Sequence, residues 1–277
     1  MKICYNETLD ASNLLQDMEL CKKYGYDQIE IRIEYLQEYL KSHSTQELKD
    51  ALKQHRLTPL AFNSVDNINF CTPKQWDELL ERFLFACRMC QELENPYIVV
   101  VPTEDASLAE KNFQEIFRDS VDVLRILSGI AAPYGASLAF EPIGNRRWCV
   151  QSIRQAAEIV QAVDRDNVGL TLDAMNLYCH CGLADMADLY KIPAGKIFVF
   201  HINDSMELPL GELEPEQHRI HPGDGVIPLK EFCRTLVVVG YKGPASLELF
   251  NPAFSVQNPE DVIREGSQKT KKLLETI

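Results

Sequence analysis

Four side chains that can bind a metal ion lie at the ends of short apolar runs in the second half of the chain. They are Glu141, Asp173, His201 and Glu248. The run 137–140, for example, leads directly into Glu141, and Glu248 lies within the run 245–250. Such a run is typical of a buried parallel strand that brings one charged group to the edge of a sheet. We therefore expect these four side chains to meet at one edge.

Three carboxylates and one imidazole are a hard, oxygen-rich ligand set that suits Mn²⁺, Mg²⁺, Co²⁺ or Zn²⁺. Carboxylates that lie side by side raise one another's pKa, so a cation is needed to keep all three ionised. One divalent ion could bind a ketone oxygen and the hydroxyl on the next carbon, which makes the neighbouring C–H acidic and stabilises an enediolate. Glu141 and Glu248 would then act as base and acid. The pattern predicts a metal-dependent isomerase or epimerase acting on a polyol ketone or a ketose.

Eight strand-like runs alternate with eight helical regions, and no linker divides them. The four earlier strands are expected at 2–5, 28–32, 60–63 and 97–101. Capping boxes at Ser44, Ser107 and Ser152, and Thr72 before a proline, mark the starts of helices, with the Ser107 helix running to about residue 133. This alternation predicts a single (β/α)8 TIM barrel over residues 1–277 rather than an open, doubly wound sheet. Barrels of this kind carry their chemistry at the C-terminal ends of the strands.

The composition excludes several classes of partner. Of the 277 residues, 45% are hydrophobic, and the net charge is −13 with a pI near 5.0. A protein that binds nucleic acid needs a basic surface, so this balance disfavours a nucleic-acid partner. No apolar run approaches the roughly 18 residues of a membrane span. The nine cysteines are scattered and odd in number, which is typical of reduced thiols in a cytoplasmic enzyme.

Several motifs resemble one known family. They are Phe140-Glu-Pro142, Leu172-Asp173, His201-Ile-Asn-Asp204, Arg219-Ile-His-Pro-Gly-Asp-Gly225 and Ser246-Leu-Glu-Leu249. Over the whole chain the sequence is similar to the xylose-isomerase-like TIM barrel family of sugar isomerases and epimerases. The resemblance implies that the four strand-end residues hold one divalent metal ion and that Glu141 and Glu248 move the proton. It also implies that Arg219 binds the substrate, with an inosose (a keto-inositol) as the first to test. Members of the family commonly associate, so a homo-oligomer fits the resemblance.

The chain departs from the family pattern at one position. Three residues after Asp173 the family usually has a histidine, and this chain has Asn176. Asparagine can hydrogen-bond a substrate hydroxyl but does not titrate near neutral pH. Asn176 is therefore a candidate for substrate binding, and the exact substrate stays open.

Further candidates lie at the ends of other strands. Asn6 and Asn63 are candidates for substrate binding, and Glu30 is a candidate for the floor of the pocket. Asp204 follows His201 by three residues. We expect it either to accept a hydrogen bond from the ring nitrogen that does not bind the metal, or to contact the substrate.

Other functions fit parts of the same pattern. A dehydratase acting on the same ketone, or a ketose 3-epimerase, would begin with the same removal of a proton. A phosphodiesterase resembling endonuclease IV shares the barrel, but it needs several metal ions, more than six histidines and a basic face. The non-enzymatic alternative is a sugar-binding barrel that has lost its activity. The complete set of four ligands argues against it, and Asn176 argues mildly for it.

Overall fold

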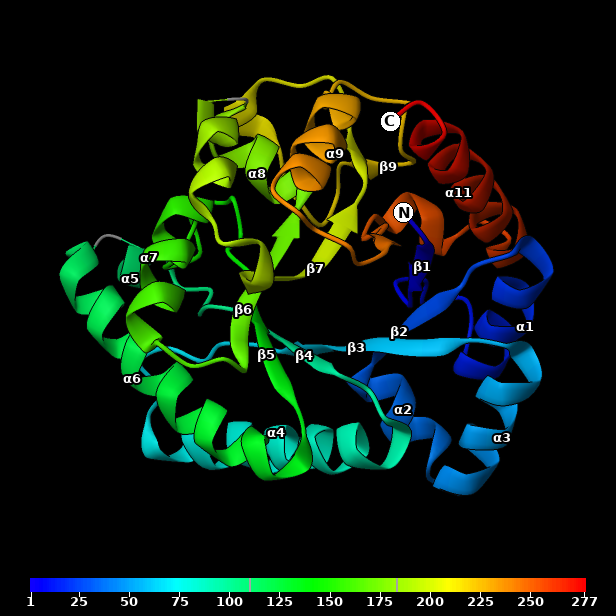
Figure 1. Ribbon diagram of the computed structural model, residues 1–277, viewed down its shortest axis with the longest axis horizontal. Helices are drawn as coiled ribbons and strands as arrows, with labels where there is room; N and C mark the ends of the chain where they lie inside the picture. Colours follow the sequence, from blue (N-terminus) through cyan, green and yellow to red (C-terminus); the bar gives the residue numbers. More distant parts are fainter. Residues whose placement is uncertain (110, 183) are drawn as a thin grey trace.

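A computed structural model describes residues 1–109, 111–182 and 184–277. Within these ranges, eight parallel strands close into a barrel that is surrounded by helices (Figure 1). The strands are β1 (Ile3–Asn6), β2 (Gln28–Arg32), β3 (Thr58–Val65), β4 (Tyr97–Val100), β5 (Ser137–Phe140), β6 (Val168–Asp173), β7 (Ile197–Ile202) and β10 (Ala245–Leu247). They follow one another around the barrel in this order, and β10 pairs with β1 to close it. The prediction of a (β/α)8 TIM barrel is confirmed.

The helices lie outside the barrel, most of them between strands that follow one another in the chain and the last two after β10 (Figure 1). They are α1 (Leu14–Tyr24), α2 (Ile33–Tyr39), α3 (Thr45–His55), α4 (Pro73–Leu93), α5 (Ala106–Ala109), α6 (Phe113–Ala131), α7 (Ile153–Val163), α8 (Ala174–Cys181), α9 (Leu229–Val238), α10 (Pro252–Ser255) and α11 (Pro259–Leu274). Ser44, Thr72 and Ser152 form the capping boxes that begin α3, α4 and α7. None of the described helices is long and apolar enough to cross a membrane.

One helix differs from the prediction. The single helix expected from Ser107 to about residue 133 is two helices, α5 and α6. α6 begins after Asn112, whose side chain accepts a hydrogen bond from the backbone N–H of Gln114. Asn112 is thus the N-cap of the longer helix. Glu110, the expected partner in the Ser107 capping box, lies outside the described residues.

The interior of the barrel is apolar at one level and polar at the next. Val199 and His201 are two residues apart in β7, so their side chains point to the same side. Val199 belongs to a small buried cluster that includes Cys4, Val99 and Ala139 from other strands. A second, larger cluster of buried residues packs the strands against the helices. The polar groups at the strand ends therefore rest on an apolar floor.

The polar stretch 204–226, which follows β7, contains a small hairpin. It is formed by β8 (Asp204–Ser205) and β9 (Arg219–Ile220), which pair antiparallel. The carboxylate of Asp204 accepts hydrogen bonds from the backbone N–H groups of Gly223, Gly225 and Ile227 at 2.9, 3.1 and 2.9 Å. A Cβ on Gly225 would lie 2.2 Å from a backbone oxygen, so the turn packs too closely for any other residue. These contacts hold the hairpin that carries Arg219.

Two carboxyl groups are fully buried beside the first strand. Glu7 follows β1, Asp17 lies in α1, and both side chains are 0% exposed. Burial raises the pKa of Asp17 to about 7. Burial, followed by the charge of Asp17, raises the pKa of Glu7 well above its ordinary value. The folded protein therefore holds these protons to a higher pH than the unfolded chain does, and its stability falls as the pH rises from about 4 towards 7 and above.

We expect Asp17→Asn to stabilise the protein at neutral and alkaline pH but not at acidic pH. An amide of the same size carries no charge, so the variant avoids ionising a buried carboxyl group. Urea unfolding should give a difference in the free energy of unfolding that is near zero at about pH 4 and widens by at most about 1.4 kcal/mol per pH unit. The matched control is Asp77→Asn at an exposed position of α4, for which no widening is expected. A difference for Asp17→Asn that stays constant over this range would contradict the prediction.

Candidate metal centre and active site

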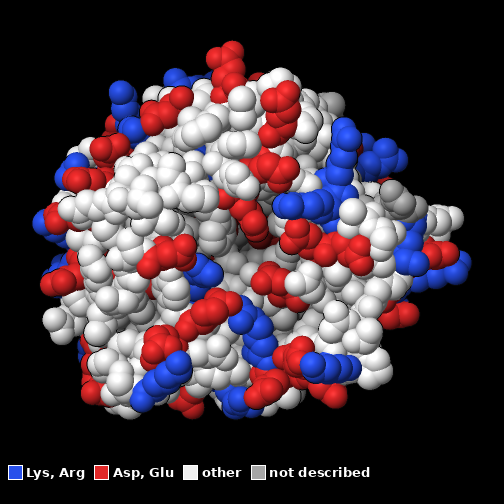
Figure 2. Space-filling view, turned by 180° about the vertical axis from the view of Figure 1, so that it is seen from behind, with Lys and Arg blue, Asp and Glu red and all other residues white. Residues whose placement is uncertain are grey.

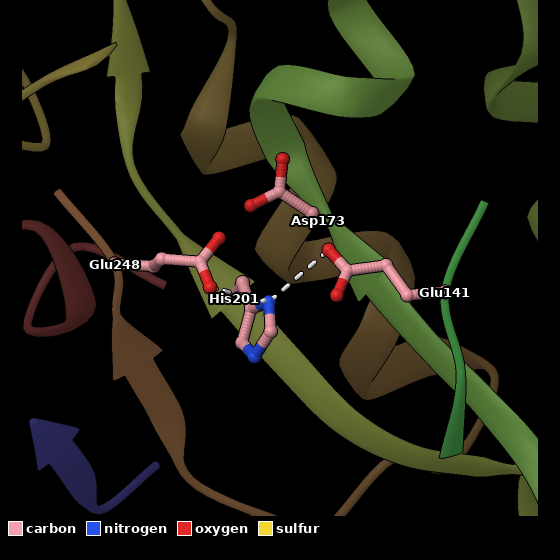
Figure 3. Close-up of side chains that lie close together, drawn as sticks. All are labelled: Glu141, Asp173, His201 and Glu248. Carbon is pink, nitrogen blue, oxygen red and sulfur yellow. Dashed lines mark hydrogen bonds and ion pairs between the residues drawn. The ribbon is translucent and has the colours of Figure 1, made fainter. Parts of the chain in front are cut away.

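Four buried side chains converge at the C-terminal ends of neighbouring strands. Glu141 directly follows β5, Asp173 ends β6, His201 lies in β7 and Glu248 directly follows β10. Each offers one ligand atom, and these four atoms lie within 4.8 Å of one another. Glu141 and Glu248 enter from opposite sides, with Asp173 and His201 between them (Figure 3). The structure thus brings together the four residues indicated by the sequence, and their role as metal ligands stays a prediction.

The register of the strands produces this convergence. Asp173 pairs with His201 between β6 and β7, and His201 pairs with Ser246 between β7 and β10. Glu248 lies two residues beyond Ser246, so both side chains point to the inside of the barrel. A shift of one residue in the pairing of either pair of strands would turn a candidate ligand away from the others.

The His201 ring lies between carboxylates at both of its nitrogens. Its Nδ1 is 3.3 Å from Oε1 of Glu141 and 3.3 Å from Oε1 of Glu248. Its Nε2 is 3.1 and 3.2 Å from the two oxygens of Glu30. Burial by itself lowers the pKa of His201, but the charges of Glu248, Glu30 and Glu141 raise it well above its usual value. The site therefore attracts positive charge.

Glu141 and Glu248 lie in surroundings that oppose a bare negative charge. Burial raises the pKa of Glu141, and the His201 ring offsets part of that rise. Burial also raises the pKa of Glu248 to about 8, against the opposing effect of His201 and Arg219. A divalent cation would favour the ionised form of both groups. This set of donors therefore fits a divalent metal ion.

Arg219 brings one positive charge into the site. It is 3% exposed, and its Nη2 lies 3.1 Å from Oε2 of Glu248 and 3.4 Å from Oδ1 of Asp173. Its Nη1 donates to the carbonyl oxygen of Pro215 at 2.7 Å. Its Nε has no hydrogen-bond partner among the described residues. Arg219 also lines the cavity, so its side chain can contact a ligand there.

Three asparagines, each indicated by the sequence, contact the two glutamates. Asn6 and Asn63 donate to Oε1 of Glu248 at 2.8 and 3.1 Å. Asn176 donates to Oε1 of Glu141 at 3.1 Å. Asn63 and Asn176 also line the cavity, whereas Asn6 is fully buried. All three therefore orient candidate ligands, and contact with a substrate stays a prediction.

Helix α8 begins at the site itself. Oδ1 of Asp173 accepts a hydrogen bond from the backbone N–H of Asn176 at 2.6 Å and caps the helix. The side-chain oxygen of Asn176 accepts from the backbone N–H of Gly144 at 3.4 Å. A Cβ on Gly144 would lie 1.8 Å from the backbone oxygen of Asn176, so this close approach requires glycine. These contacts direct the amide of Asn176 towards Glu141.

Asp204 does not accept a hydrogen bond from His201, so that part of the prediction is wrong. Its oxygens bind the backbone of the loop 223–227. The group that faces Nε2 of His201 is Glu30. Asp204 was favoured because it is near His201 in the chain, whereas Glu30 comes from β2, with β1 and β10 between it and β7 around the barrel.

Asn203 lies within the motif His201-Ile-Asn-Asp204 but was not among the predicted site residues, and it also contacts a candidate ligand. Its Nδ2 donates to Oδ2 of Asp173 at 2.6 Å, and its Oδ1 accepts from the backbone N–H of Met175 at 2.9 Å. Asn203 lies two residues after His201. The alternation of side chains along a strand was therefore the signal that could have identified it.

The cluster opens into a cavity of about 260 Å³ that is lined largely by polar side chains. Trp148 and Phe250 contribute aromatic surface to its wall, and Arg32 and Glu104 contribute charge. Figure 2 shows a hollow near the middle of the molecule that is bordered by acidic side chains with basic ones among them. A small, mostly polar cavity with some aromatic surface suits a small polyhydroxy molecule.

The fold and the site place this protein among the (β/α)8 barrels that carry a candidate metal centre at the C-terminal ends of their strands. A family model described as "Xylose isomerase-like TIM barrel" matches residues 18–273, and the chain belongs to this family. Curated relatives named "Inosose isomerase" include one from Bacillus velezensis, which is 38% identical over 99% of this chain and 97% of its own length. Another, from Halalkalibacterium halodurans, is 39% identical over 99% of this chain and 96% of its own. Among solved structures, the crystal structure of the IOLI protein with a binding zinc atom has a TM-score of 0.92 and 37% identity, covering 99% of this chain and 98% of that one.

Proposed function

We propose that this protein is an inosose isomerase, which moves the ketone of a keto-inositol to the neighbouring carbon. The substrate class is supported by the full-length similarity to relatives named "Inosose isomerase". The mechanism is carried by one observation, the convergence of Glu141, Asp173, His201 and Glu248 with their ligand atoms within 4.8 Å. These four residues would hold one divalent metal ion, and the zinc atom of the IOLI protein supports this assignment. When bound, the ion would polarise the ketone and make the neighbouring C–H more acidic.

Glu141 and Glu248 would move the proton. They enter from opposite sides of the cluster (Figure 3), so a substrate bound between them would have one carboxyl group on each side, which suits one base and one acid. One carboxylate removes the proton from the hydroxyl-bearing carbon next to the ketone, which gives an enediolate. The other, which starts the turnover protonated, donates its proton to the former carbonyl carbon, and a hydroxyl proton passes between the two substrate oxygens, so the two carboxyl groups end the turnover with their protonation states exchanged. The ketone thus shifts by one carbon without consuming an oxidant.

Residues of the cavity wall would orient the substrate. Arg219 has an Nε donor without a partner among the described residues, and Asn63 and Asn176 also line the cavity. Amide and guanidinium groups bind hydroxyl and carbonyl oxygens. Trp148 and Phe250 offer aromatic surface to the C–H faces of a ring. A cyclic polyol ketone presents both kinds of surface.

The test measures the exchange of substrate protons for deuterium from the solvent. The protein, loaded with Mn²⁺ or Zn²⁺, is incubated with an inosose in D₂O, and proton NMR follows exchange next to the ketone and the appearance of a second inosose. We expect both with bound metal and neither after treatment with a chelator. Inositol, which has no ketone, is the matched control and should not exchange.

Other outcomes distinguish the alternatives. Exchange without the appearance of a second inosose would support the proposed proton transfer but contradict the assignment of this inosose as the substrate. Loss of water would indicate a dehydratase. Neither metal binding nor exchange would indicate a barrel that only binds sugars.

A further inference from the structure

A buried carboxylate outside the candidate ligand set faces the far side of the His201 ring. Glu30 lies in β2 and is 0% exposed. Its oxygens are 3.1 and 3.2 Å from Nε2 of His201. The hydroxyl of Ser246 donates to Oε2 of Glu30 at 2.8 Å. Glu30 thus contacts the ring from the side opposite to Glu141 and Glu248.

This contact determines which ring nitrogen is available to a metal ion. A carboxylate accepts hydrogen bonds and has no hydrogen to donate, so the nitrogen facing Glu30 carries the hydrogen. Carboxylates face both ring nitrogens, but only those at Nδ1, from Glu141 and Glu248, belong to the candidate ligand set. With an ion held there, Nδ1 would give its lone pair to the ion, and Nε2 would keep the hydrogen that it donates to Glu30. The opposite tautomer would point a lone pair at the Glu30 carboxylate, which is unfavourable in a buried site.

The arrangement is fixed by the barrel and not by local sequence. Ser246 is paired with His201 in the register of β10 and β7, so both side chains enter the interior at one level. Glu30 reaches this level from β2, with β1 and β10 between β2 and β7 around the barrel. A buried carboxylate is costly unless it is hydrogen-bonded, and these two donors satisfy it. The three side chains therefore hold one another in a single orientation.

We propose that Glu30, supported by Ser246, is a positioning residue that holds His201 with Nδ1 directed at the metal site. This inference rests on the proposed function, because it requires that His201 is a metal ligand. Glu30 touches neither metal nor substrate in this scheme and acts through the ring. Groups that orient a ligating histidine in this way commonly change metal affinity by 10- to 100-fold.

The experiment measures zinc affinity by competition with a chromophoric chelator in three variants. Glu30→Gln keeps the size of the side chain and removes its charge, and we expect zinc to bind about 10- to 100-fold more weakly. Ser246→Ala leaves Glu30 in place without one donor, and we expect a smaller loss in the same direction. Glu7→Gln is the matched control. Glu7 is also 0% exposed and lies next to β1, and its replacement should leave zinc affinity unchanged.

A second measurement determines which nitrogen of the His201 ring carries the hydrogen. In the zinc-loaded wild type with ¹⁵N-labelled histidine, NMR should show His201 protonated at Nε2 and zinc-bound at Nδ1. Glu30→Gln with unchanged affinity and the same ring signals would overturn the inference. So would an equal loss of affinity in Glu7→Gln, because the effect would then be general to the core. If the wild type itself binds no zinc, the metal site of the proposed function fails, and the inference fails with it.

Discussion

Replacing Glu248 by glutamine is expected to lower kcat for inosose isomerisation by about 100- to 10,000-fold, because the amide cannot take or give the proton. Glutamine keeps an oxygen that can accept the hydrogen bonds of Asn6 and Asn63, so the local shape is preserved. The ionised Glu248 also pairs with Arg219 at 3.1 Å, and this pair is lost. The rate would be followed by NMR in D₂O, with the metal content determined on the same sample.

The matched control is Glu158→Gln on the surface. Glu158 forms an exposed ion pair with Arg154 within α7, and such a pair contributes little to stability. We expect wild-type rates from this variant. A Glu248→Gln protein that retains its metal and its full rate would exclude Glu248 from the chemistry. If activity returns at a higher metal concentration, Glu248 serves only to bind the ion.

Replacing Arg219 by methionine is expected to destabilise the metal-free protein by about 3–5 kcal/mol, because two buried carboxylates lose a positive partner. The guanidinium lies 3.1 Å from Glu248 and 3.4 Å from Asp173. Methionine keeps the length and apolar character of the stem, so charge is the main change. A bound divalent ion supplies positive charge to the same carboxylates, and the loss of stability should therefore shrink when zinc is present. Urea unfolding in chelator and in zinc would measure both values.

Arg147→Met provides the comparison for that experiment. Arg147 is half-exposed and pairs with Glu104 at 3.1 Å and Glu214 at 3.5 Å. Loss of a surface pair of this kind should cost less than about 1 kcal/mol with or without zinc. An equally small loss for Arg219→Met would show that its guanidinium does not neutralise the site. A loss that zinc leaves unchanged would show that Arg219 and the ion do not share the same carboxylates.

Local patterns were sufficient for the architecture. The apolar runs and the capping residues Ser44, Thr72 and Ser152 predicted strands and helices because they act within a few residues of one another. The helix after Ser107 shows the limit of such signals. A second cap, Asn112, begins α6 a few residues later, and the capping-box pattern at Ser107 did not reveal it.

Contacts within the site were harder to predict. Spacing along the chain favoured Asp204 as the partner of His201, but its carboxylate is occupied by the backbone of the loop 223–227. Glu30 faces His201 from a strand 171 residues away in the sequence. Hydrogen-bond partners depend on direction and distance in space, and a closed barrel places residues from distant strands at the same level.

The amino-acid sequence by itself determined the alternation of strands and helices and the placing of four metal-competent side chains at strand ends. Both follow from periodicity and turn chemistry, which are local. Only the tertiary structure decided that Arg219 faces Glu248 and Asp173, that three asparagines hold the glutamates, and that Glu30 contacts His201. These contacts arise from the closure and the register of the barrel. Both bring together groups whose distance in space cannot be inferred from their separation along the chain.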